Sequence, residues 1–252
     1  MKRMILAGIA LLTTGLSGLM AQTPAVPKPK SNGERKVVVS IQTAATGGDA
    51  DAIIKAAEDL LSNYADSDFK EYALTMEAKA YQIKHDDENA QVFAERVLQV
   101  NPKAFTMQLL IAEAITPNIK EFDLNRAQEI EKCTKLFTDA IENAKVAPKP
   151  SAQVPDADWE QQKKWAVAEA HNGMGMLLSL QKGKGDESIK EFQLAVDGDP
   201  EQDAYSTRLA NAYLAAGKKT EAIAICDKLL AKPNLHPQIK SVVTSIKNAA
   251  SH

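Results

Sequence analysis

The sequence predicts an all-α fold of about ten helices, arranged as helix–turn–helix pairs in a solenoid. From Gly48 onward, apolar residues recur at the spacing of one helix face in segment after segment. The stretches between these segments are short and often contain glycine or proline, which end helices. Aromatic residues make up only 5% of the chain and alanine is abundant. This composition suits closely packed helices better than a sheet.

The helices can be placed from their apolar faces and end signals. The first is expected to begin after Asp49, a good N-cap residue, and to carry Ile53, Ala57 and Leu60 on its apolar face. A proline-rich stretch at residues 147–155 interrupts the helical run. The later helices are expected at about residues 69–83, 90–101, 105–117, 123–146, from 156 onward, and at 186–197, 201–216, 220–231 and 237–249.

Residues 22–47 are predicted to be a flexible leader that precedes the solenoid at 48–252. Its first part, up to Asn32, is rich in proline, lysine and small residues. The segment Lys36–Ile41 has the β-branched residues of a strand. It has no second strand to pair with, so we expect an extended leader or an N-terminal cap.

Residues 1–21 are predicted to be a secretory signal peptide. Two basic residues precede an uncharged apolar stretch from Met4 to Met20, and cleavage is expected after Ala21 or, as a fallback, after Ala25. An uncleaved membrane anchor is the alternative, but the stretch is short and contains several Thr, Ser and Gly residues. We therefore expect an exported protein, periplasmic or secreted, with no membrane insertion after cleavage.

Three helix pairs share a pattern of a large residue, a small residue and a closing proline at nearly constant spacing. This pattern resembles the tetratricopeptide repeat, a helix–turn–helix unit of about 34 residues. Small residues at Ala90, Gly175, Ala210 and Ala222 would let paired helices approach closely. Glu77 departs from the pattern, because the family has an apolar or bulky residue there. The three sets are Tyr81, Ala90 and Pro102; Leu178, Ser188 and Pro200; and Tyr213, Ala222 and Pro233.

The resemblance implies a concave surface lined by the first helix of each pair, which binds a protein or peptide. Some members hold a peptide's terminal carboxylate with lysine, asparagine and arginine at such positions. Here the asparagines and an arginine are present but the lysines of that set are missing, so no carboxylate clamp is predicted. The groove positions that the resemblance indicates are Lys79 in the first pair, Asn172 and Met176 in the second, and Arg208 and Asn211 in the third.

The sequence contains no motif for catalysis, so we expect no catalytic residue, no metal ligand and no cofactor. His171 lies in a helix where a packing residue belongs, and His85 lies in an acidic turn without metal-ligand spacing. The two cysteines, Cys133 and Cys226, occupy apolar helix faces. Two buried thiols are favoured over a disulfide, although export would permit one.

Composition narrows the function further. The net charge is −3 and there is no basic excess, so a nucleic-acid partner is not expected. The sequence favours a non-enzymatic adaptor or scaffold of the cell envelope or secreted fraction that binds a protein or peptide partner. The alternative is a self-associating structural or envelope-assembly component, in which the outer face or the long helices make the contacts.

Overall fold

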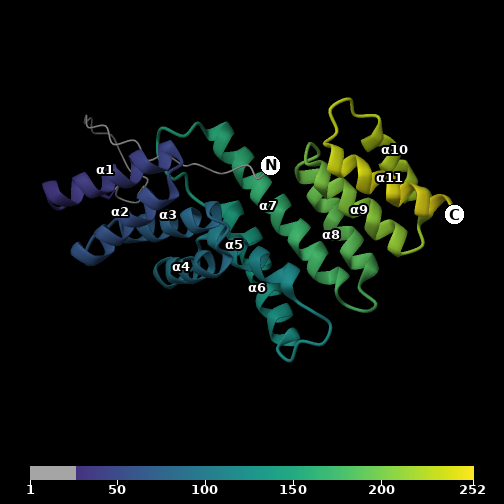
Figure 1. The fold of residues 1–252 in the computed structure, drawn as a ribbon, viewed down its shortest axis with the longest axis horizontal. Coiled ribbons are helices and arrows are strands. Elements are labelled where there is room, and N and C mark those ends of the chain that lie inside the picture. Colours follow the sequence, from purple (N-terminus) through teal and green to yellow (C-terminus); the bar gives the residue numbers. More distant parts are fainter. Residues whose placement is uncertain (1–26) are drawn as a thin grey trace. The chain divides into compact units, whose positions relative to one another are not determined.

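The computed structural model describes residues 27–252. The predicted signal peptide at 1–21 and the first residues of the predicted leader lie outside the described residues. Within 27–252 the chain forms eleven α-helices, one short 3-10 helix and no strand (Figure 1). The predicted all-α, helix–turn–helix repeat fold is therefore confirmed, with one helix more than expected. Residues 147–155 lie outside any helix.

The helices fall into two compact units, the first made of residues up to 110 together with 148–159, and the second of 111–147 and 160–252. Two helices, α5 and α7, contribute to both units. The helices are α1 (Asn32–Gly47), α2 (Ala50–Asn63), α3 (Lys70–Ile83), α4 (Asp87–Val100), α5 (Phe105–Ile115), η1 (Thr116–Asn118), α6 (Arg126–Val146), α7 (Asp156–Ser179), α8 (Gly185–Gly198), α9 (Asp203–Ala215), α10 (Lys219–Leu230) and α11 (Pro237–Ser251).

The first unit has a core formed by α1, α2 and α3, and α4 packs on α3. Val38 and Ile41 of α1 and Leu60 of α2 are fully buried in this core. In the same unit, Phe105 at the start of α5 packs against Trp159 of α7, with ring centroids 6.2 Å apart. These contacts join segments that are distant in sequence within one unit.

The prediction of an extended leader at residues 35–45 is wrong, because α1 covers this segment. Ser31 caps the helix by accepting a hydrogen bond from the backbone N–H of Glu34 at 3.1 Å, and Gly48 ends it with a φ of 69°. The buried carboxylate of Glu34 also accepts a hydrogen bond from the Ser67 hydroxyl at 2.5 Å. Packing of Val38 and Ile41 against α2 and α3 overrides the strand preference of this segment.

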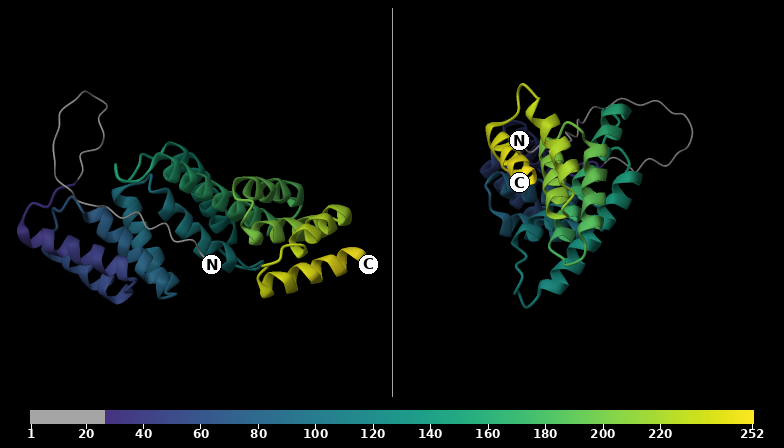
Figure 2. Two further views of the ribbon diagram at one scale, coloured as in Figure 1. Left: turned by 90° about the horizontal axis from the view of Figure 1, so that it is seen from above. Right: turned by 90° about the vertical axis from the view of Figure 1, so that its right-hand side faces the viewer.

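In the second unit, α8 to α11 lie side by side, each packed on the next (Figure 1). The final helix, α11, contacts both α9 and α10, as the views in Figure 2 show. Its Val243 and Ile246 complete a core with Ala210 of α9 and Cys226 of α10. Its opposite face is largely exposed.

Small residues bring paired helices together, as the sequence predicted. At Gly175 on α7, an added Cβ would lie 2.7 Å from the ring of Phe192 on α8. The buried hydroxyl of Ser188 donates to the carbonyl of Gly175 at 2.8 Å. Ala210 and Ala222 are fully buried in the next pair. The close approach of the helices therefore depends on residues without bulky side chains.

One ion pair recurs at the same place in both units. Lys84, which follows α3, pairs with Asp51 near the start of α2. Lys218, which follows α9, pairs with Asp186 near the start of α8 at 2.7 Å. These pairs are exposed and contribute little stability. Their recurrence shows that the two helix pairs have the same register.

None of the helices in residues 27–252 has the length and apolar character needed to cross a membrane.

Candidate peptide-binding surface

The groove positions that the sequence indicated in the second unit lie on two helices. Asn172 and Met176 are one turn apart on α7, and Arg208 and Asn211 are one turn apart on α9. Residues spaced by three or four positions share a helix face, so each pair projects from one side of its helix. Asn172 is buried, Met176 and Arg208 are half-buried, and Asn211 is exposed.

Three of these side chains contact one another. The Arg208 guanidinium donates from Nη1 to Oδ1 of Asn172 at 3.1 Å. The amide nitrogen of Asn172 lies 3.9 Å from the sulfur of Met176, as a weak hydrogen bond. Met176 also packs against the apolar cluster formed by α8 and α9. The structure thus joins α7 to α9 by a polar contact that has an apolar side chain beside it.

The charges around Arg208 were not foreseen from the sequence as part of this site. Burial lowers the pKa of the Arg208 guanidinium, while Tyr205 and Glu113 oppose this by favouring its positive form. Burial raises the pKa of the Tyr205 phenol strongly, and the nearby carboxylates of Glu169 and Glu113 add to this effect. Arg208 therefore lies in a partly desolvated setting with acidic neighbours, which stabilise its charge from within the chain.

Glu169 lies three residues before Asn172 on α7, so helical spacing places it on the same face. Tyr205 is almost fully buried beside Ala168 and Ala195, and Glu113 comes from α5. Tyr205 lies one turn before Arg208 on α9, so helical spacing connects these two residues. No local pattern connects Glu113 with Arg208. The part of Glu113 follows only from the structure, which places its carboxylate near enough to favour the charged form of Arg208.

The remaining residue predicted to face the groove, Lys79, lies on α3 in the first unit and is half-buried. Burial lowers the pKa of its ammonium group. On the same helix, burial raises the pKa of the Tyr72 phenol to about 12. The first unit thus also presents a partly desolvated polar helix face, separate from the one formed by α7 and α9.

The other residues considered for chemistry have structural surroundings. Nδ1 of His171 lies 2.7 Å from the Glu191 carboxylate and links α7 to α8. In residues 27–252 no group of three or more His, Cys, Asp and Glu side chains is placed to hold a metal ion. Asp86, in the acidic turn after His85, caps α4 by accepting from the backbone N–H of Asn89 at 3.1 Å.

Both cysteines are free and buried. Burial raises the pKa of each thiol, so neither is poised as a thiolate nucleophile. The Cys133 sulfur lies 3.9 Å from the carbonyl of Ala112, to which its thiol donates. The interpretation of Cys133 and Cys226 as buried thiols agrees with these surroundings.

Comparison with protein families matches residues 179–246 to the tetratricopeptide repeat. This part of the chain is similar to tetratricopeptide repeats. The matched range includes α9 and α10, one of the three helix pairs that carry the spacing pattern, and most of α11. Tetratricopeptide repeats as a class mediate contacts between proteins and are generally not catalytic. No curated protein matches the sequence.

Solved structures share the tetratricopeptide fold along most of the chain. A thermophilic tetratricopeptide protein of Thermus thermophilus is 17% identical, with a TM-score of 0.55 over 84% of this chain and 98% of its own. An assembly chaperone of RpL4 is 13% identical, with a TM-score of 0.63 over 86% and 84%. MamA of Desulfovibrio magneticus is 12% identical, with a TM-score of 0.52 over 87% and 97%. At these identities the likeness concerns the fold.

Proposed function

We propose that this chain is a non-enzymatic adaptor or scaffold that binds a protein or peptide partner along the first helices of its repeats. In the second unit the contact surface comprises Asn172, Met176, Arg208 and Asn211. The contact between Arg208 and Asn172 carries the proposal, because it places a half-buried cation and an amide from two adjacent first helices on one surface. In the first unit, Lys79 occupies the repeat position that Met176 and Asn211 occupy in the second unit.

The chemistry of this surface favours a mixed polar and apolar partner. Arg208 already has carboxylates nearby and donates to Asn172. A partner carboxylate would have to compete with these groups. A guanidinium has five N–H groups, so Arg208 has others besides the one that donates to Asn172. Carbonyl groups of an extended peptide can accept from these. Met176 and the exposed Asn211 add an apolar and a polar contact beside it.

The function of one structural neighbour is compatible with this proposal. That neighbour is an assembly chaperone of RpL4, so a protein of the same fold acts on a protein partner. The absence of a candidate nucleophile, acid–base pair or metal cluster among the residues of the site supports a binding role rather than catalysis.

We further propose that the protein works outside the cytoplasm, in the periplasm or as a secreted protein. The apolar stretch after Lys2 and Arg3 supports this location. N-terminal sequencing of the protein recovered from its cells is expected to give Gln22 as the first residue, or Val26 if the fallback site is used. Recovery of the intact N-terminus in the membrane fraction would instead support the uncleaved anchor.

Photo-crosslinking tests the binding surface. A photoreactive residue at the exposed position Asn211 on α9 is expected to capture a discrete partner in the native cell fraction. In the matched control, the photoreactive residue replaces Lys228. This position is exposed on α10, the second helix of the same pair. Equal yields at both positions, or a crosslink at Lys228 alone, would contradict the proposed surface.

A further inference from the structure

A loop in the second unit holds two large apolar side chains in solvent. Residues 119–125 connect η1 to α6, and in this loop Phe122 is 89% exposed and Leu124 is 107% exposed. Glu121, next to Phe122, is exposed as well. Within residues 27–252 these two are the most exposed of the large hydrophobic side chains. Such an apolar pair at a loop tip is typical of a contact surface.

The loop has a defined conformation. The Asp123 carboxylate accepts a hydrogen bond from the backbone N–H of Lys120 at 2.7 Å, and its carbonyl accepts from the backbone N–H of Arg126 at 3.1 Å. The Arg126 guanidinium also donates to the carbonyl of Leu180 at the end of α7. The outward position of Phe122 is therefore set by the fold, so that little ordering is needed when it binds.

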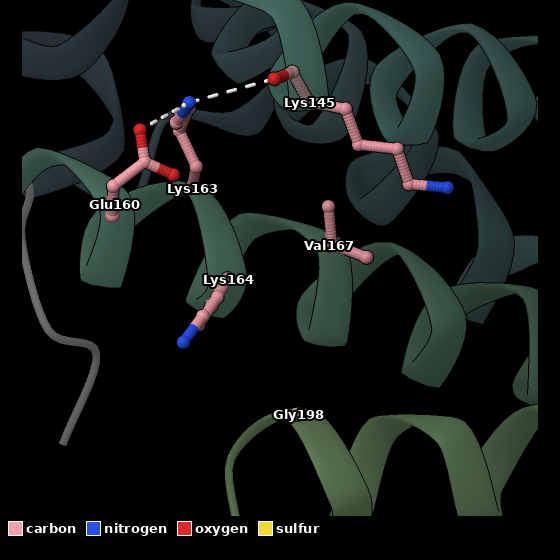
Figure 3. Close-up of a pocket in the computed structure, with 6 residues that line it drawn as sticks. All are labelled: Lys145, Glu160, Lys163, Lys164, Val167 and Gly198. Carbon is pink, nitrogen blue, oxygen red and sulfur yellow. Dashed lines mark hydrogen bonds and ion pairs between the residues drawn. The ribbon is translucent and has the colours of Figure 1, made fainter.

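The same unit contains a small hollow with a basic rim, of about 260 Å³, between the ends of α6 and α8 and the first half of α7 (Figure 3). It is smaller than the roughly 300–1,000 Å³ of a typical small-molecule site, so it suits a single side chain. Its lining residues are Lys145, Glu160, Lys163, Lys164, Val167 and Gly198.

The lining gives the hollow both apolar and basic character. Lys163 is engaged within the chain, since its ammonium pairs with Glu160 at 2.7 Å and donates to the carbonyl of Lys145 at 3.4 Å. Lys145 and Lys164 are exposed, and Val167 extends from α7 toward the side of Lys145 (Figure 3). Gly198 lies close to α7, because a Cβ there would meet the Cβ of Ala168 at 2.9 Å.

We propose that the Phe122 loop of one copy of this chain docks into the lysine-rimmed hollow of a second copy. The aromatic ring of Phe122 fits a one-side-chain hollow beside Val167, and the acidic Glu121 matches the exposed Lys164 in charge. The loop and the hollow are different surfaces of one chain, so the contact is head-to-tail and can continue from copy to copy. It uses none of the groove residues and does not depend on the proposed partner binding.

The contact is small, so the association is expected to be weak and to depend on concentration. Sedimentation velocity of the mature chain at concentrations up to about 1 mM is expected to show an average mass that rises above the monomer value as the concentration increases. Replacing Phe122 by serine is expected to raise the dissociation constant about tenfold to a hundredfold. The matched control is Val242→Ser on α11, which is 50% exposed and is expected to have no effect.

Charge reversal distinguishes this specific contact from nonspecific hydrophobic association. Glu121→Lys and Lys164→Glu are each expected to weaken self-association, while an equimolar mixture of the two single variants associates again through the complementary pair of surfaces. A photoreactive residue at Phe122 is expected to crosslink a second, isotope-labelled copy within residues 160–167. A monomer at every concentration, no recovery in the mixture, or a crosslink to another region would each overturn the proposal.

Discussion

Replacing Glu77 by leucine is expected to stabilise the protein at pH 8 and to remove a fall in its stability between about pH 4.5 and 7. Glu77 lies on α3 and is fully buried, and neither carboxylate oxygen has a hydrogen-bond partner. The pKa of this carboxyl is raised from 4.5 to about 7, mainly by burial and also by the charge of Glu58, while Arg96 opposes the rise. The folded protein therefore disfavours the ionised form.

The size of the effect follows from the pKa difference. Below about pH 4.5 the Glu77 carboxyl is protonated in both the folded and the unfolded chain. The share of the unfolding free energy that depends on its protonation is then fully present. As the pH rises toward 7, only the unfolded chain releases the proton, so the free energy of unfolding falls. Each pKa unit corresponds to roughly 1.4 kcal/mol, which gives a loss of about 3 kcal/mol by pH 8.

Urea unfolding followed by circular dichroism, measured at several values between pH 4.5 and 8, checks this expectation. The quantity of interest is the difference in unfolding free energy between Glu77→Leu and the native chain, because other titrating groups cancel in it. Glu77→Gln removes the charge but leaves a buried amide without partners, so it should stabilise less than leucine does at pH 8. Hydrogen exchange of the α3 amides locates the effect in the first unit.

Two neighbours provide internal controls. Glu58→Gln should lower the pKa of Glu77, since the Glu58 charge raises that pKa. The pH range over which the unfolding free energy falls should then be narrower. Arg96→Gln should do the opposite, because the guanidinium lowers the pKa of Glu77. A difference between Glu77→Leu and the native chain that stays constant from pH 4.5 to 8, or grows toward acid, would refute the reasoning.

Three smaller predictions concern backbone and packing, and each can be measured by urea unfolding. Gly175→Ala should destabilise by about 1–3 kcal/mol, because its Cβ would meet the Phe192 ring at 2.7 Å, whereas Gly47→Ala has open space and should be neutral or stabilising. His85→Gly should stabilise by about 0.5–1 kcal/mol, since this residue has a φ of 57°. Ser31→Ala should cost about 1 kcal/mol through the lost cap of α1. The corresponding reasoning would be contradicted if Gly175→Ala or Ser31→Ala left the unfolding free energy unchanged, or if His85→Gly lowered it.

The sequence predicted most of the helices because their signals are local. An N-cap such as Asp49, a closing Pro102 and an apolar face at helical spacing occur within one segment. The exception is α1, where consecutive valines favour a strand. Its Ser31 and Glu34 have the spacing of a helix-capping pair, which was available in the sequence as a helix signal. The outcome there depends on α2 and α3, against which Val38 and Ile41 pack.

The departure of Glu77 from the repeat pattern was visible in the sequence, but its consequence was not. A carboxylate at a position where the family has an apolar or bulky residue can turn outward, find a partner or remain buried alone. Which of these occurs depends on the packing of α2 and α4 around α3. Only the structure shows that both oxygens lack a partner within the described residues.

The candidate surface was predictable in position but not in electrostatics. Repeat spacing placed Asn172 and Arg208 on first helices, yet the bond between them joins residues 36 positions apart. That bond constrains what can bind. A ligand that drew Arg208 away would leave the buried Asn172 oxygen unpaired, at a cost of about 1–3 kcal/mol. A partner that accepts from the other N–H groups of Arg208 avoids this cost. If the proposed surface binds a partner, ligands that add to the existing contact are therefore favoured over ligands that replace it.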